Sequence, residues 1–154
     1  MEVKELVEIL NRMTNIFRDL VKIFNQLDDA VEKKDIEEIN KIVNRIKDTT
    51  KDLNNLETER MELTKSFCEK YKIQESARAL AIELKNPELT QALNLLIESI
   101  NDLLIKRDYT MNILKTHIDY LNFSIDYFKK LLSFGNYDEK GKTSKYINLL
   151  DKEG

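Results

Sequence analysis

Glycine, proline, cysteine and tryptophan are scarce in this chain of 154 residues, which contains 3 Gly, 1 Pro, 1 Cys and no Trp. Glycine and proline together make up roughly 3% of the residues, against an average near 12%. β-Sandwiches and Rossmann-type domains need far more turn residues than this. Because 42% of the residues are hydrophobic, the composition also argues against a disordered chain. The composition therefore predicts a protein built of long helices.

No charge of one sign dominates the chain, which has 25 basic and 28 acidic residues and a formal net charge of −3. Without a basic stripe we expect no nucleic-acid partner. The apolar runs are only a few residues long, so we expect no direct membrane insertion. The first residues lack the basic and apolar regions of a signal peptide, and a lone cysteine cannot form an internal disulfide. The sequence therefore predicts a cytoplasmic protein.

Apolar residues at alternating steps of three and four mark two long helices. The first set is Val3, Leu6, Leu10, Met13, Phe17, Leu20, Phe24, Leu27 and Val31, and the second is Ile39, Ile42, Ile46, Thr49, Leu53, Leu56, Arg60, Leu63 and Phe67. These seams predict helices over about 2–32 and 36–71. Asp35, with Glu38 three residues later, resembles a capping box. A connection of about three residues forces the two helices into an antiparallel hairpin.

The periodicity weakens between Tyr71 and Ser76, and an Ala-rich segment then predicts a short helix over 76–84. Asn86, Pro87 and Glu88 provide a cap, a first-turn proline and a first-turn acid for a third long helix over 87–134. The predicted fold is all-α: an elongated antiparallel bundle, or coiled coil, of three long helices with a short helix after the second. We expect 1–134 to form a single helical-bundle domain and 135–154 a flexible C-terminal tail.

The sequence offers little for catalysis. His117 is the only histidine, so neither a two-histidine metal site nor a di-iron bundle can form. A lone histidine on a helix also suits a phosphotransfer domain, but His117 lacks the Lys-Gly pair that follows the histidine in such domains. Cys68 has no histidine nearby in the sequence. We therefore predict no catalytic residues, no metal, no cofactor and no enzymatic activity.

The third long helix has two apolar faces. Its main seam is Leu114, Ile118, Leu121, Ile125, Phe128 and Leu132, and a second stripe about 140° away contains Ile105, Tyr109, Ile113, Tyr120, Phe123, Tyr127, Leu131 and Phe134. One interpretation is a central helix that contacts a neighbour on each face. The other is that part of the second stripe receives an amphipathic helix from a partner, which tyrosine-rich surfaces favour.

Three short motifs lie on this layout. They are the segment 56–63 (LETERMEL) in the second predicted helix, Asn112 and Leu114 followed by Ile118 and Leu121 in the third, and the segment 137–141 (YDEKG) after it. With these motifs and three long helices, the chain resembles the FlgN-type flagellar export chaperones. The first motif is similar to the leucine, glutamate and arginine pattern of that family's second helix, the second motif to the pattern of its third helix, and the last to its terminal element.

The resemblance implies a chaperone that binds the C-terminal helices of the hook-associated proteins, which form the hook–filament junction. Such a chaperone prevents premature assembly of these clients and delivers them to the type III export gate. It implies that the client contacts Tyr109, Ile113, Tyr120, Phe123, Tyr127, Leu131 and Phe134, and that Tyr137 docks to the cytoplasmic domain of the gate.

A structural antiparallel coiled-coil spacer or adaptor without a client is the alternative. It predicts that both faces of the third helix are buried, for example in a homodimer.

Overall fold

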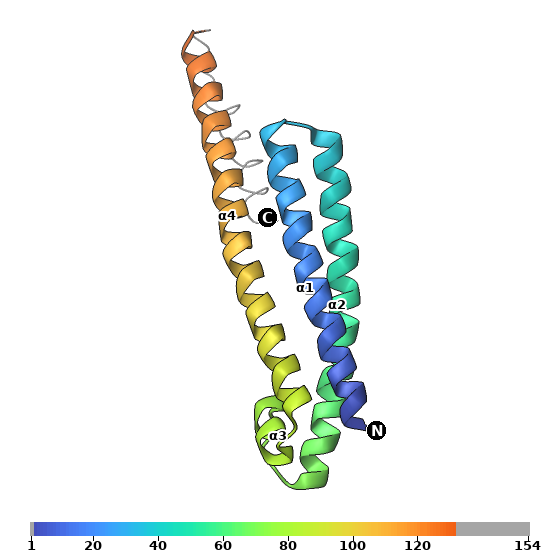
Figure 1. The fold of residues 1–154 in the computed structure, drawn as a ribbon. Helices are drawn as coiled ribbons and strands as arrows, with labels where there is room; N and C mark the ends of the chain where they lie inside the picture. Colours follow the sequence, from blue (N-terminus) through green and yellow to red (C-terminus); the bar gives the residue numbers. More distant parts are fainter. Residues whose placement is uncertain (1, 132–154) are drawn as a thin grey trace. The chain divides into compact units, whose positions relative to one another are not determined.

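The computed structural model describes residues 2–131, which form four α-helices. They are α1 (Glu2–Glu32), α2 (Ile36–Tyr71), α3 (Ala77–Leu84) and α4 (Pro87–Leu131) (Figure 1). Three long helices with a short one after the second confirm the predicted all-α fold. The predicted tail, 135–154, lies outside the described residues. No helix within 2–131 is long and apolar enough to cross a membrane.

Side chains cap the N-termini of three helices. Asp35 accepts a hydrogen bond from the backbone N–H of Glu38 at 3.1 Å, which confirms the predicted cap of α2. Ser76 accepts one from Ala79 N–H at the start of α3, at 3.3 Å. Asn86 accepts one from Leu89 N–H at the start of α4, at 3.1 Å. Each cap satisfies a backbone donor that has no partner within its own helix.

Three lysines end helices in a backbone conformation that glycine usually adopts. Lys34, Lys72 and Lys85 have φ angles of 57°, 53° and 49°. The N–H of Lys72 donates to the carbonyls of Cys68 and Glu69 at the end of α2. A non-glycine residue in this left-handed region costs about 1 kcal/mol or more. These three turns are thus made without glycine, at a small cost in stability.

The chain divides into two compact units, Met1–Arg107 and Asp108–Gly154. In the first unit, α1 and α2 form the predicted antiparallel hairpin, and α3 contacts α2 (Figure 1). A core cluster joins all four helices of this unit. Its buried members are Leu6, Ile9, Leu10, Met13, Leu56, Phe67, Cys68, Leu80, Ala81, Leu89, Ala92 and Leu96. The α4 residues of this cluster fix the start of that helix on the hairpin.

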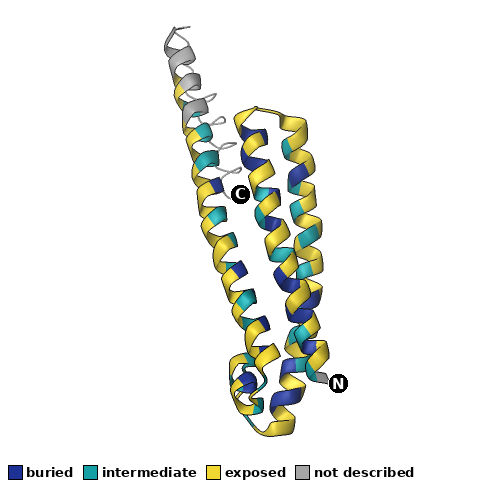
Figure 2. Ribbon diagram, in the orientation of Figure 1, coloured by how far each residue is buried: buried dark blue, intermediate teal, exposed yellow. Residues whose placement is uncertain are grey.

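The predicted seams of α1 and α2 coincide with their packed faces. Six of the nine α1 positions are buried: Leu6, Leu10, Met13, Leu20, Leu27 and Val31. The other three, Val3, Phe17 and Phe24, are half-buried. All nine α2 seam positions are buried or half-buried. Figure 2 shows the buried residues as dark bands that recur along both helices, between exposed ones. The heptad spacing therefore located the hairpin interface.

A buried ion pair joins α1 to α4 within the first unit. The Asp28 carboxylate contacts the Lys106 ammonium group, and their side chains are only 9% and 17% exposed. The second carboxylate oxygen of Asp28, Oδ1, is buried without a hydrogen-bond partner. The sequence analysis did not anticipate this contact. Removing two charges from water is costly, so we expect an apolar pair of similar volume at these positions to be at least as stable.

Candidate functional site

In the second unit, the described part of α4 exposes two aromatic side chains on one face. Tyr109 is 57% exposed and Phe123 is 68% exposed. They are 14 positions apart in the sequence, which places them about 21 Å apart along the helix and about 40° apart around it. Two large aromatic groups therefore share one solvent-facing side of the helix.

The other side of the same helical segment is less accessible. Thr110 is 1% exposed, and Leu114, His117 and Ile118 are half-buried. Ile113 lies at the edge between the two sides and is half-buried. The predicted stripe is thus not uniform, because Tyr109 and Phe123 are exposed whereas Ile113 is partly covered.

The remaining predicted client-binding residues are located only in part. Tyr120, Tyr127 and Leu131 belong to α4, where the helical repeat places them within about 80° of Phe123. Phe134 and the predicted gate-docking residue Tyr137 lie outside the described residues. The candidate surface therefore consists of one helix face, with Tyr109 and Phe123 as its described aromatic members.

Cys68 and the seam residue Arg60 both make contacts that belong to the fold. Cys68 is buried, with its sulfur 3.8 Å from the carbonyl oxygen of Ser76. Arg60 donates two hydrogen bonds to Glu57 of the same helix, at 2.6 and 2.8 Å. These hydrogen bonds raise the pKa of Arg60, and partial burial opposes them. Within residues 2–131, no group of three or more His, Cys, Asp or Glu side chains is placed to hold a metal ion.

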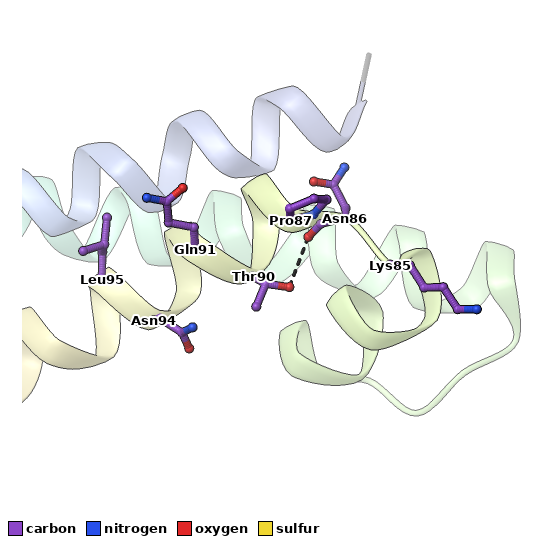
Figure 3. A pocket seen from close by; sticks show the side chains of 7 residues that line it. All are labelled: Lys85, Asn86, Pro87, Thr90, Gln91, Asn94 and Leu95. Carbon is purple, nitrogen blue, oxygen red and sulfur yellow. Dashed lines mark hydrogen bonds between the residues drawn. The ribbon is translucent and has the colours of Figure 1, made fainter.

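A shallow pocket of about 460 Å³ lies where α3 joins α4 (Figure 3). It is lined by Lys85, Asn86, Pro87, Thr90, Gln91, Asn94 and Leu95. Two of these residues already serve the helix start, because Asn86 caps α4 and the Thr90 hydroxyl donates to the Asn86 carbonyl at 3.1 Å. The lining contains no histidine, cysteine or carboxylate, so we assign the pocket to the helix junction rather than to a reaction.

Thr110 is buried although it belongs to neither of the predicted apolar faces of α4. Thr110 continues a set at steps of three and four from Leu96, Ser99, Leu103 and Lys106, and both Ser99 and Thr110 are almost fully buried. A search restricted to apolar residues overlooks such positions. The spacing alone, read without regard to polarity, is the signal that could have identified them.

Comparisons with known proteins identify the family. The family model described as FlgN protein matches residues 1–145. Searches of curated proteins and of solved structures found no match. The family match covers nearly the whole chain, including both helices of the hairpin and all of α4. This chain therefore belongs to the FlgN family and is a flagellar export chaperone.

Proposed function

We propose that this chaperone binds the C-terminal helices of the hook–filament junction proteins through the exposed side of α4. The observation that carries the proposal is the pair of exposed aromatic side chains Tyr109 and Phe123 on one face of that helix. Large aromatic groups at exposed positions are typical of protein interfaces, where they supply much contact area. The chain acts by binding, without catalysis or a cofactor, and it does so in the cytoplasm.

The geometry suits a helical client. Tyr109 and Leu131 are 22 positions apart on α4, a length of about 33 Å. An amphipathic client helix of about 20 residues, with apolar residues at steps of three and four, matches this length. Tyr109, Tyr120, Phe123, Tyr127 and Leu131 anchor it, with Ile113 and Phe134 at the margins. The client segment is disordered alone and becomes ordered as it docks, which keeps the affinity moderate and the complex reversible.

Delivery to the export gate uses a different part of the chain. We assign it to Tyr137, which follows the client-binding residues and is the aromatic residue that matches the family's gate contact. Separate positions let the chaperone hold its client while it docks. Tyr137→Ala should therefore reduce binding to the cytoplasmic domain of the gate and leave client affinity unchanged. Loss of client binding in this variant would contradict the division of roles.

Isothermal titration calorimetry tests client binding directly. The titrants are C-terminal peptides of the two junction proteins from the same genome, with a flagellin C-terminal peptide as the negative control. We expect micromolar or tighter binding of the junction peptides only. Phe123→Ala should weaken that binding by about 1–2 kcal/mol, a common cost of truncating a central aromatic anchor.

Lys115→Ala is the matched control variant. Lys115 is exposed on the same helix, about 80° around it from Phe123 and 120° from Tyr109, on the side away from Tyr127 and Leu131. Its affinity should equal that of the native chain. Equal losses of affinity in Phe123→Ala and Lys115→Ala would contradict the proposal that the client binds the exposed aromatic side of α4. No heat with any peptide, in a protein that is folded and helical, would favour the spacer without a client.

A further inference from the structure

A second surface lies on the hairpin, in the first unit, between α1 and α2. Residues from both helices line an open groove of about 440 Å³ there. Its apolar floor is formed by Ile9, which is 7% exposed, and Leu63, which is half-buried. The α1 residues that line it differ from Val7 and Asn11, which line a separate pocket together with α4 residues. The hairpin therefore presents this groove on a flank of α1 that α4 does not share.

The walls of the groove are strongly acidic. Glu5 and Glu8 from α1 and Glu59 and Glu62 from α2 line it, together with a single basic residue, Arg12. Four acids and one base give this lining a net charge of −3, which equals the formal charge of the entire chain. This local excess of negative charge attracts cationic groups.

These charges are not used within the fold. Among the residues that the structure describes, none of the five charged side chains of the groove takes part in an ion pair or a side-chain hydrogen bond. The carboxylates also do not converge on a point, because within 2–131 no three of them are placed to hold a metal ion. Their spacing along two helices suits several separate cationic groups rather than one small cation.

We propose that this acidic groove, defined by the seven residues above, docks a basic amphipathic helix of a partner protein. One apolar side chain of that helix covers Ile9 and Leu63, and lysine or arginine residues one turn to either side reach the glutamates. A helix suits the site because the same hairpin already packs α4 against its other flank through Leu89, Ala92 and Leu96. Charge complementarity selects the partner, whereas the apolar floor sets its register. This surface is separate from the aromatic face of α4.

Arg12, the one basic residue of the groove, affects which charges a partner helix can carry. It lies among the carboxylates without pairing with any of them in the groove, so it repels a partner that is purely basic and attracts one that carries a carboxylate at the matching position. Arg12→Ala should therefore tighten the binding of an all-lysine helix by about two- to fivefold, the range expected for one exposed charge pair.

Fluorescence anisotropy with a labelled synthetic helix tests the proposal on the full chain. The probe is about 14 residues long, four helical turns, with leucines on one face and lysines on both sides of that face. A scrambled peptide of the same composition, which has no apolar face, is the negative control. The test variant is Glu8→Lys/Glu62→Lys, and the matched control is Glu83→Lys/Glu98→Lys. The control changes the net charge equally at exposed positions of α3 and α4.

We expect the native chain to bind the amphipathic probe and not the scrambled one. The groove variant should lose at least about tenfold in affinity and the matched control less than about threefold. Equal losses in the two variants would show that binding follows net charge alone and would overturn the proposal. Failure of the native chain to bind would overturn it too. So would a native dimer, detected by sedimentation, that Glu8→Lys/Glu62→Lys dissociates, because the occupant would then be a second copy.

Discussion

The two stretches of α4 use their apolar residues in different ways. The first, within the first unit, buries Leu89, Ala92 and Leu96 at 0%, 2% and 6% exposure in a core shared with three other helices. The second, from Asp108 onward, leaves Tyr109 and Phe123 more than half exposed. A single helix therefore carries both a packing surface and an exposed aromatic one.

The difference teaches that apolar residues on one helix can serve two purposes. Some are buried and stabilise the fold, whereas others stay accessible to a partner. Burial of a leucine stabilises the fold by about 1.5–3 kcal/mol, and the first stretch uses Leu89 and Leu96 in this way. Tyr109 and Phe123 in the second stretch keep more than half of their surface accessible. A partner chain can cover this surface. Variants in the two stretches should therefore affect different measurements.

Leu89→Ala should have the largest effect on stability. Leu89 is 0% exposed in the core cluster, and truncation of such a leucine costs about 2–5 kcal/mol through lost burial and a residual cavity. Urea unfolding followed by circular dichroism measures this loss. Ile105→Ala is the control, because Ile105 is 70% exposed on the same helix, and its stability should stay within about 0.5 kcal/mol of the native value. Similar losses in both variants would contradict the comparison.

Lys106→Met should have the next largest effect. It removes the cation that faces the buried Asp28 carboxylate, whose Oδ1 already has no partner, and we expect a loss of about 2–4 kcal/mol in the free energy of unfolding. Asp28→Leu/Lys106→Met, which removes both charges, should recover most of that loss. If the double variant were as unstable as the single one, the ion pair would be a net stabilising contact, contrary to our description.

The sequence predicted the hairpin better than it predicted α4. In α1 and α2 a single seam is apolar and the opposite face is charged, so the spacing identified the packed residues directly. In α4, apolar residues occur on several sides, and Ile97, Leu104 and Ile105 are exposed whereas Ser99 and Thr110 are buried. Only packing against neighbouring elements decides which side is covered. The spacing could therefore propose two faces without ranking them.

Tyr109 and Thr110 are adjacent in the sequence, but the first is exposed and the second is buried. Tyr109→Ala should weaken the binding of a junction peptide by about 1 kcal/mol and leave the unfolding free energy nearly unchanged, because this side chain is exposed. Thr110→Val should instead leave peptide binding unchanged and alter the free energy of unfolding. The Thr110 hydroxyl is buried without a hydrogen-bond partner, so its replacement by a methyl group should raise stability by up to about 1 kcal/mol. Calorimetry and urea unfolding of both variants provide the two readouts.

Lys72→Gly should have the smallest effect. Lys72 ends α2 with a φ of 53°, a conformation that glycine adopts without steric cost. The substitution should raise the free energy of unfolding by about 0.5–1 kcal/mol and leave client affinity unchanged. Lys70→Gly, two residues earlier and inside α2, should instead destabilise the chain. A loss of stability in Lys72→Gly would mean that the lysine side chain contributes more than its backbone conformation costs.

Amide hydrogen exchange with and without a bound junction peptide tests the central claim most directly. It reports which backbone segments become protected when the client docks. We predict slower exchange in the part of α4 from Tyr109 to Leu131, together with little change in the hairpin formed by α1 and α2. Protection confined to the hairpin, with exchange in that part of α4 unaltered, would contradict the assignment of the client to the exposed aromatic face.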